Sequence, residues 1–322
     1  MQIHRIELPS ITGMKTVNSF LIKGEGLTLV DAGEGTEESY QVLKGELLTL
    51  GVKLGDLDEL LITHAHVDHI GGAGRIAEEN NLKVRVSDRV LPWTKGIREQ
   101  WGGRGSIIKD TLSAIMPDAL FQMSEAMYGE MQETMMNIWH DIPQELIETF
   151  DILQPEIEIN GEKWKMIYAP GHSSTQNCFY HEDSRQLLSA DMILKITPTP
   201  VMESRLDDPT KRAKGILEML DSYKLFDEMK LDKVFPGHYN VIPNAHEIIS
   251  DQIVRIHRRK EETFQSIKSG KSKIVEIYNE VYKGKIHLPA FNMLIGYFDL
   301  LEDEGRIEYF YNGEYNEIRM VD

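Results

Sequence analysis

The order of apolar and polar residues predicts strands at the start of the chain. Residues 3–8, 19–23 and 27–31 are rich in β-branched and aliphatic residues, and Gly24-Glu25-Gly26 suits a turn between the last two segments. Residues 37–50 change to helical periodicity, and 58–62 indicate the end of a buried strand. Glycines then lead into a helical stretch near Arg75. The pattern predicts strands followed by helices.

The segment from 88 to about 150 is different, because its pattern is helical. It holds six of the fifteen methionines, and Met123, Met127, Met131 and Met135 are spaced four residues apart. This spacing favours a stripe packed on the core or on a partner subunit. The alternative is a flexible apolar wall for a substrate, since methionine adapts to irregular ligands. The sequence Trp-Gly-Gly-Arg-Gly at 101–105 indicates a mobile loop that could act as a lid.

Strands resume after this insertion. Residues 157–159 and 164–168 flank an Asn-Gly turn, and 178–181 and 186–191 continue the strand pattern. A helix is expected over 209–229, followed by a last strand that ends before His238. We therefore predict one α/β domain over 1–244, interrupted by the helical insertion.

Residues 245–322 are expected to form a second domain. A long charged helix over 245–268 is followed by helices at 274–281 and 289–304 and by a hairpin with an Asn-Gly turn. This order is the outline of a winged-helix module, which often binds DNA. However, the stretch 291–304 has four acidic residues and no lysine or arginine, whereas a groove-reading helix needs cationic or amide side chains. The helix is better explained as packing in a subunit interface or an active-site wall.

The composition restricts partners and location. A chain of 322 residues with 41% hydrophobic residues can bury a full core, and its net charge of −17 argues against nucleic-acid or anionic membrane partners. Cys178 is the one cysteine, so an intrachain disulfide is excluded and a reducing compartment is expected. The start of the chain has no signal-peptide pattern, and no apolar run approaches the ~20 residues of a membrane span. We expect a cytoplasmic protein, either monomeric or a homodimer.

Metal-binding residue types gather at one point of the predicted domain. His64, His66, Asp68 and His69 lie on a strand-to-helix turn, and three later strands each end in one further such residue: His172, Asp191 and His238. Imidazole and carboxylate groups are ligands for zinc, manganese or iron, and four of them on one loop can place two ions side by side. Asp31, at another strand end, could cap the next helix. Alternatively, it could support the metal site by orienting one of the ligands or the loop that carries it.

These motifs resemble those of the metallo-β-lactamase-fold hydrolases, and they occur in that family's order. The resemblance implies an αββα sandwich of two mixed sheets, with a helical insertion and a C-terminal winged-helix-like extension. It also implies two divalent ions, with zinc expected and manganese or iron as alternatives. One ion would be held by His64, His66 and His172, and the other by Asp68, His69 and His238. Asp191 would bridge the two ions, and Asp31 matches the family's supporting aspartate.

The implied chemistry is hydrolysis by a hydroxide held between two metal ions. Asp68 could orient the nucleophile or take its proton, and no serine or cysteine nucleophile is needed. His66 replaces the glutamate of the flavodiiron branch, which argues against redox chemistry. We expect a small or medium carboxyl derivative as the substrate: a thioester, ester or lactone. The alternatives are a phosphodiesterase or nuclease, because the tail is similar to that of a branch with an endoribonuclease, and a non-catalytic metal sensor.

Overall fold

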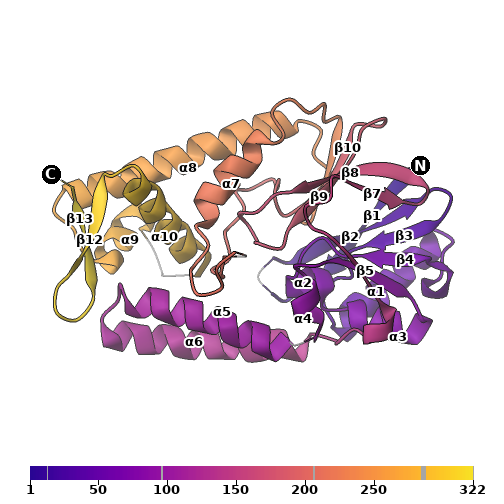
Figure 1. Cartoon of the computed structure of the whole chain (residues 1–322), viewed down its shortest axis with the longest axis horizontal. Helices are drawn as coiled ribbons and strands as arrows, with labels where there is room; N and C mark the ends of the chain where they lie inside the picture. Colours follow the sequence, from indigo (N-terminus) through magenta and orange to yellow (C-terminus); the bar gives the residue numbers. More distant parts are fainter. Residues whose placement is uncertain (13, 96, 206, 284–287, 322) are drawn as a thin grey trace.

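Two β-sheets face each other in a computed structural model that describes residues 1–12, 14–95, 97–205, 207–283 and 288–321 (Figure 1). The first sheet has six strands in the order β1-β2-β3-β4-β5-β6. Its first three strands are antiparallel and the remaining pairs are parallel. The bounds are β1 Gln2–Pro9, β2 Thr16–Lys23, β3 Leu27–Val30, β4 Glu59–Leu61, β5 Lys83–Ser87 and β6 Ile147–Phe150. The predicted N-terminal strands are confirmed, whereas β6 lies in what was predicted as insertion.

The second sheet has five strands in the order β11-β10-β9-β8-β7. β10 and β11 are parallel, and the other neighbours are antiparallel. The bounds are β7 Glu156–Ile159, β8 Glu162–Tyr168, β9 Asn177–His181, β10 Gln186–Ala190 and β11 Lys233–Pro236. Asn160 and Gly161, which join β7 to β8, both have positive φ (52° and 75°), as the predicted Asn-Gly hairpin turn requires.

Alternating side chains build the layers of the sandwich. In the first sheet Phe20, Ile22 and Val30 point to the second sheet, while their neighbours Leu21 and Leu29 pack against helices on the outer face. The outer helices are α1 Glu37–Thr49 and α3 Ala73–Asn80 on the first sheet and α7 Gly215–Lys224 on the second, with short helical turns η1 Leu54–Asp56, α2 Val67–Ile70 and η2 Gln144–Leu146 between elements. The αββα architecture expected from the sequence is confirmed.

The helix predicted over 209–229 is shorter at both ends, because α7 begins only at Gly215 and ends at Lys224. Before it, Ser204 and Arg212 form an isolated antiparallel bridge, and the side chain of Arg212 is engaged with the C-terminal part of the chain. Residues 209–214, which the periodicity placed in the helix, instead lie in a turn and in this bridge.

The insertion consists of α4 Leu91–Lys95, α5 Ile97–Ser113 and α6 Asp118–Asn137, with α5 and α6 side by side along one edge of the molecule (Figure 1). The loop predicted at 101–105 is wrong, since these residues lie within α5. Ile97, Trp101 and Ile108 are buried there, so tertiary packing outweighs the poor helix propensity of the glycines. Met131 and Met135 pack against the hydrophobic cluster that contains Leu21 and Leu29, as the first interpretation of the stripe expects. The side chains of Met123 and Met127 lie outside the described part of the structure.

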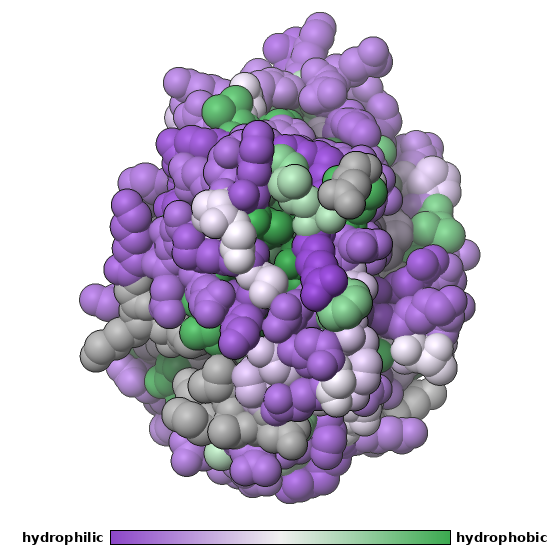
Figure 2. All heavy atoms as spheres, turned by 90° about the vertical axis from the view of Figure 1, so that its left-hand side faces the viewer, coloured by the Kyte–Doolittle hydropathy of each residue, from purple (hydrophilic) through white to green (hydrophobic). Residues whose placement is uncertain are grey.

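The C-terminal module follows the predicted order of elements. It comprises α8 Ala245–Lys268, α9 Ile274–Tyr282, α10 Leu288–Asp303, β12 Ile307–Tyr311 and β13 Asn316–Met320. Its buried residues belong to the same hydrophobic cluster as those of α7 and the end of α5, so this module shares a core with the sandwich. The surface at this end is mostly hydrophilic, with small apolar patches (Figure 2). The domain boundary at 244/245 and the name winged helix stay predictions.

In α10 the apolar residues face inward, and Phe291, Leu294 and Phe298 are buried in the shared core. The acidic helix therefore packs within its own chain, and a role in a subunit interface or an active-site wall stays a prediction. None of the helices in the described ranges is both long enough and apolar enough to span a membrane.

Candidate metal centre

All seven residues predicted as metal ligands converge at one edge of the sandwich. His64, His66, Asp68 and His69 lie on the turn after β4 and on α2, and the other three follow β8, β10 and β11. The Nδ1 atom of His66 lies 2.9 Å from Nε2 of His172. The Nε2 atom of His238 lies 3.4 Å from Asp68 Oδ2 and 3.2 Å from Asp191 Oδ2. The first two of these contacts join residues more than a hundred positions apart.

Within this cluster, three groups of side chains could each hold a metal ion. Their ligand atoms lie within 4.8 Å of one another, and the groups are His64, His66 and His172; Asp68, His69 and His238; and His64, His69 and Asp191. Asp191 lies between the first two groups, since its Oδ2 is 3.3 Å from Nε2 of His172 and its Oδ1 is 3.5 Å from Nε2 of His69. The first two groups contain the residues that the resemblance assigns to the two ions, whereas the third combines one residue from each of these sets with Asp191.

Several buried polar atoms at the centre have no hydrogen-bond partner among the described residues. They are the Nε2 atoms of His64, His66 and His69 and the Oδ1 atom of Asp191. A buried nitrogen or oxygen without a partner costs free energy, and native proteins rarely tolerate several together. Imidazole nitrogens and carboxylate oxygens are the donors that zinc, manganese and iron accept. The donor set and its orphaned atoms therefore fit divalent metal ions.

Hydrogen bonds on the far side of the rings select the tautomers. The Nδ1 atom of His172 donates to the carbonyl of Thr199 at 2.8 Å, and that of His238 donates to the carbonyl of Thr16 at 2.6 Å. A carbonyl oxygen can only accept, so Nδ1 carries a proton in both rings and Nε2 is the nitrogen left to bind a metal ion. The backbone thus orients both rings with Nε2 toward the cluster.

Asp31 performs the same task for two further histidines. Its Oδ2 accepts from Nδ1 of His69 at 2.7 Å and from the Thr63 hydroxyl at 2.9 Å, and its Oδ1 accepts from the Thr63 amide at 2.9 Å. Because that hydroxyl donates to Asp31, it can accept from Nδ1 of His64, 2.9 Å away. Asp31 is therefore a supporting residue, and the N-cap of α1 is Thr36.

Three residues in or beside the cluster have left-handed backbone conformations. Asp31 (φ 60°), Ala190 (φ 43°) and Tyr239 (φ 69°) have positive φ, and the last two adjoin Asp191 and His238. Such conformations are costly for residues other than glycine and concentrate at functional sites. A Cβ atom on Gly237 would lie 2.0 Å from Asp191 Oδ1, so this position has room only for glycine.

The charges of the metal-free cluster are strongly coupled. Burial disfavours protonated His69, but Asp191 and Asp31 outweigh it and raise its pKa to about 10; against the same burial, Asp191 raises the pKa of His238 to about 12. For Asp68, burial favours the neutral acid, yet His69 and His238 lower its pKa to about 2. Burial lowers the pKa of His64 well below its ordinary range, and His69 adds to this effect. The carboxylates are ionised at neutral pH and available to a cation.

One charged pair beside the cluster was missed from the sequence. Arg104 of α5 is 6% exposed and donates to Glu203 at 3.0 Å, and its guanidinium lies over the rings of Trp93 and Trp101 at 4.6 and 4.9 Å from their centroids. The carboxylate of Glu203 also accepts from the amide of Ser174, two residues beyond His172. From the sequence, Arg104 was only one of several basic residues in an acidic insertion, because a contact between residues 99 positions apart leaves no local pattern.

Comparison with known families decides the identity of the fold. A family model described as the metallo-beta-lactamase superfamily matches residues 12–238, more than half of the chain. The chain belongs to this superfamily. Among its relatives, "Probable metallo-hydrolase YqjP" from Bacillus subtilis is 23% identical, over 96% of this chain and 94% of the relative. "Probable metallo-hydrolase MJ0888" from Methanocaldococcus jannaschii is 25% identical, over 69% and 86%.

Solved structures of superfamily proteins share the whole architecture. A metallo-beta-lactamase family protein from Thermus thermophilus has a TM-score of 0.75 at 19% identity, covering 99% of this chain and 98% of that one. A beta-lactamase domain protein from Burkholderia ambifaria also has a TM-score of 0.75, at 16% identity, covering 99% and 92%. The chain is a metal-dependent hydrolase of the metallo-beta-lactamase superfamily. The individual ligand roles and the identity and number of ions stay predictions.

Proposed function

We propose that the protein is a dinuclear metallohydrolase that acts on a small or medium carboxyl derivative: a thioester, ester or lactone. His64, His66 and His172 would hold one ion, and Asp68, His69 and His238 the other. The position of Asp191 is the observation that carries the proposal, because its two oxygens lie within 3.5 Å of nitrogens from both groups. Zinc is the expected ion for a histidine-rich set, with manganese and iron as alternatives.

When bound, divalent ions would supply a water of lowered pKa, near ~7, as the nucleophile and would polarise the substrate carbonyl. Asp68 is half-buried and ionised, so its carboxylate can accept a hydrogen bond from that water and orient it. The buried Cys178 takes no part, since burial raises the pKa of its thiol and disfavours the thiolate.

The surroundings support a carboxyl substrate over a polyanion. The chain carries a net charge of −17, and the acidic helix α10 is packed into the core with no cationic side chain to meet a phosphate backbone. Apolar and aromatic residues of the insertion, including Trp93 and Trp101, lie around the buried Arg104 near the site.

The test is a panel of acyl-thioesters, aryl esters and lactones given to the purified, metal-loaded protein. We expect cleavage of at least one class, abolished by chelation and restored by added zinc, and lost in an Asp68→Ala variant. Cleavage of a phosphodiester by a protein that leaves the whole panel intact would overturn the proposal.

A phosphodiesterase or nuclease is the second candidate, because the helices and hairpin of the C-terminal module follow the order of a winged helix. This candidate requires binding to RNA or single-stranded DNA that weakens steeply with salt. Absence of binding at low salt would exclude it. We also propose a cytoplasmic location and a homodimer; cell fractionation and light scattering test these two points.

A further inference from the structure

Residues 199–205 and 207–213, here called the positioning loop, hold the histidine that follows β8. The Nδ1 atom of His172 donates to the carbonyl of Thr199, and the amide of Val201 donates at 2.9 Å to the carbonyl of His172. The loop thereby fixes both the ring and the backbone of this residue. Whatever fixes the loop also fixes the direction in which Nε2 of His172 points.

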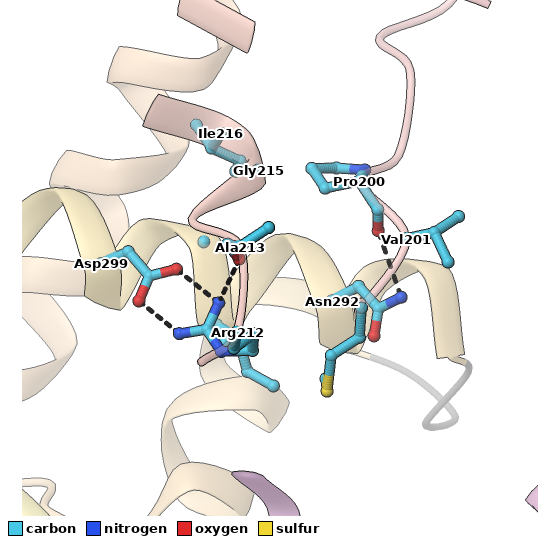
Figure 3. A pocket seen from close by; sticks show the side chains of 11 residues that line it. Pro200, Val201, Arg212, Ala213, Gly215, Ile216, Asn292 and Asp299 are labelled. Carbon is cyan, nitrogen blue, oxygen red and sulfur yellow. Dashed lines mark hydrogen bonds and ion pairs between the residues drawn. The ribbon is translucent and has the colours of Figure 1, made fainter. Parts of the chain in front are cut away.

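The C-terminal module fixes the loop from one side. Asn292 of α10 donates to the carbonyl of Pro200 at 3.2 Å, between the two residues that contact His172 (Figure 3). Farther along, Arg212 forms a two-pronged ion pair with Asp299 of α10, at 2.8 and 2.5 Å (Figure 3). Asp299 is 1% exposed, so solvent screens this pair little.

The insertion fixes the loop from the other side. Glu203 receives the guanidinium of Arg104 from α5, and the same carboxylate accepts the amide of Ser174. The backbone of Glu203 is tied in turn to Ala213, whose amide donates to its carbonyl at 2.8 Å. Glu203 therefore links α5, the loop and the chain just beyond His172.

The loop also packs closely against the start of α7. A Cβ atom on Gly215 would lie 2.5 Å from Cβ of Pro200 and 2.8 Å from the carbonyl of Gly171, the residue before His172. A Cβ atom on Gly296 of α10 would lie 2.5 Å from Cδ1 of Ile216 in α7. The loop, α7 and α10 thus meet at van der Waals distance around the base of His172.

We propose that the ion pairs Arg104–Glu203 and Arg212–Asp299 are positioning pairs that act through the positioning loop on His172. The insertion and the C-terminal module would thereby set the metal affinity of the group formed by His64, His66 and His172. This inference rests on the proposed role of His172 as a ligand. It assigns to both appended segments a task at the metal centre, although neither contributes a ligand.

The expected size follows from known metal sites. A group that accepts a hydrogen bond from the other ring nitrogen of a metal-binding histidine contributes roughly 10- to 100-fold to metal affinity. Here the carbonyl of Thr199 is such a group, and its position depends on both ion pairs. Breaking either pair should weaken one metal site and leave the site of Asp68, His69 and His238 unchanged, because Thr16 and Asp31 orient those histidines.

The test uses Asp299→Asn and Glu203→Gln, which remove the charge but keep the shape. Two matched controls remove ion pairs from the same segments without touching the loop: Glu304→Gln breaks the pair with Lys260 inside the C-terminal module, and Glu125→Gln breaks the pair with Lys109 inside the insertion. For each folded variant, competition with a chromophoric chelator gives the zinc affinity of both sites. The absorption spectrum of the cobalt-loaded protein reports the ligand geometry.

We expect Asp299→Asn and Glu203→Gln each to weaken one zinc site by about tenfold or more and to change the cobalt spectrum. The controls should keep both affinities. Unchanged affinities, equal weakening of both sites, or the same weakening in the controls would overturn the proposal, since a purely structural role lowers the melting temperature alone. If a variant does not fold, Arg212→Lys, which keeps the charge but loses the two-pronged contact, provides the same comparison.

Hydrogen exchange gives a reading that needs no metal. In metal-free protein the amide of Val201 should exchange faster in Asp299→Asn than in Glu304→Gln, and equal rates would contradict the role of the loop. None of these measurements uses a substrate. A protein that binds zinc as described but cleaves no carboxyl derivative would therefore refute the proposed reaction and leave the positioning pairs intact.

Discussion

The carboxylate of Asp31 lies 2.7 Å from Nδ1 of His69 and reaches His64 through the hydroxyl of Thr63. One carboxylate thus orients a histidine from each of the two proposed metal sites. The left-handed backbone of Asp31, with φ of 60°, allows it to turn back toward both rings. Aspartate and asparagine tolerate this conformation better than other residues with a side chain.

Replacing Asp31 by alanine should weaken both sites. The change leaves Nδ1 of His69 and the amide of Thr63 without a partner in the core, which costs about 1–3 kcal/mol each, and it should lower metal affinity roughly 10- to 100-fold. Titration with zinc and thermal melting measure the two effects. Asp31→Asn is the matched control, because it suits the backbone and keeps one acceptor oxygen; an alanine variant no weaker than this control would contradict the orienting role.

Replacing Thr63 by valine should affect one site only. Valine has nearly the same shape but lacks the hydroxyl between Asp31 and His64, while the direct bond from His69 to Asp31 remains. We therefore expect the site containing His64 to lose roughly tenfold in affinity. Separate measurement of the two zinc affinities checks this. Equal loss at both sites would mean that the hydroxyl has no specific effect on His64.

Binding of metal should release protons. In the metal-free protein His69 (pKa about 10) and His238 (pKa about 12) are protonated at pH 7, whereas a metal ligand must be neutral. Calorimetric titrations in buffers of different ionisation enthalpy should show about two protons released per fully loaded protein. Affinity should rise with pH, and a binding enthalpy independent of the buffer would contradict the assignment.

The same raised pKa values affect the stability of the metal-free protein. Because the pKa of His69 is raised from 6.5 to about 10, its stabilising contribution is complete below pH 6.5 and is lost as the pH rises through about 10. Metal-free protein should therefore unfold at lower urea concentration at pH 10 than at pH 7. The zinc-loaded protein should lack this part of the decline, since its histidines are already neutral.

Replacing Gly237 by alanine should damage the centre directly. The new methyl group would lie 2.0 Å from Oδ1 of Asp191 and 2.7 Å from Cε1 of His69, so one of them must move. We expect zinc affinity to fall by at least roughly tenfold. Gly45, an exposed helical glycine with no atom within 4 Å of its Cβ position, is the control: Gly45→Ala should bind normally and gain about 1 kcal/mol in stability. Normal zinc binding by Gly237→Ala would refute the assigned geometry.

The sequence was sufficient to predict that these seven residues lie together, because each occupies the end of a strand or the turn after it. Strand ends meet at one edge of a sheet, so His172, Asp191 and His238 could be grouped from their positions along the chain. The supporting atoms could not be found in this way. His172 and His238 donate to the backbone carbonyls of Thr199 and Thr16, and a carbonyl oxygen is present in every residue.

The errors in the secondary structure have a similar cause. Glycines favoured a loop at 101–105, but burial of Trp101 and Arg104 keeps these residues in α5. Strand β6 has only four residues and lies at the edge of its sheet, so its pattern was too short to recognise. The predicted helix over 209–229 loses its first residues to the contact of Arg212 with Asp299. In α5 and before α7, a distant contact outweighs the local preference.

The contact between Arg212 and Asp299 also bears on how the protein is made. A ribosome completes the seven predicted metal ligands before it adds α10, which follows them in the chain. A nascent chain therefore carries the histidines and carboxylates while the loop behind His172 still lacks its C-terminal contacts. Stable loading with metal is expected only after α10 has been synthesised and has docked against the loop.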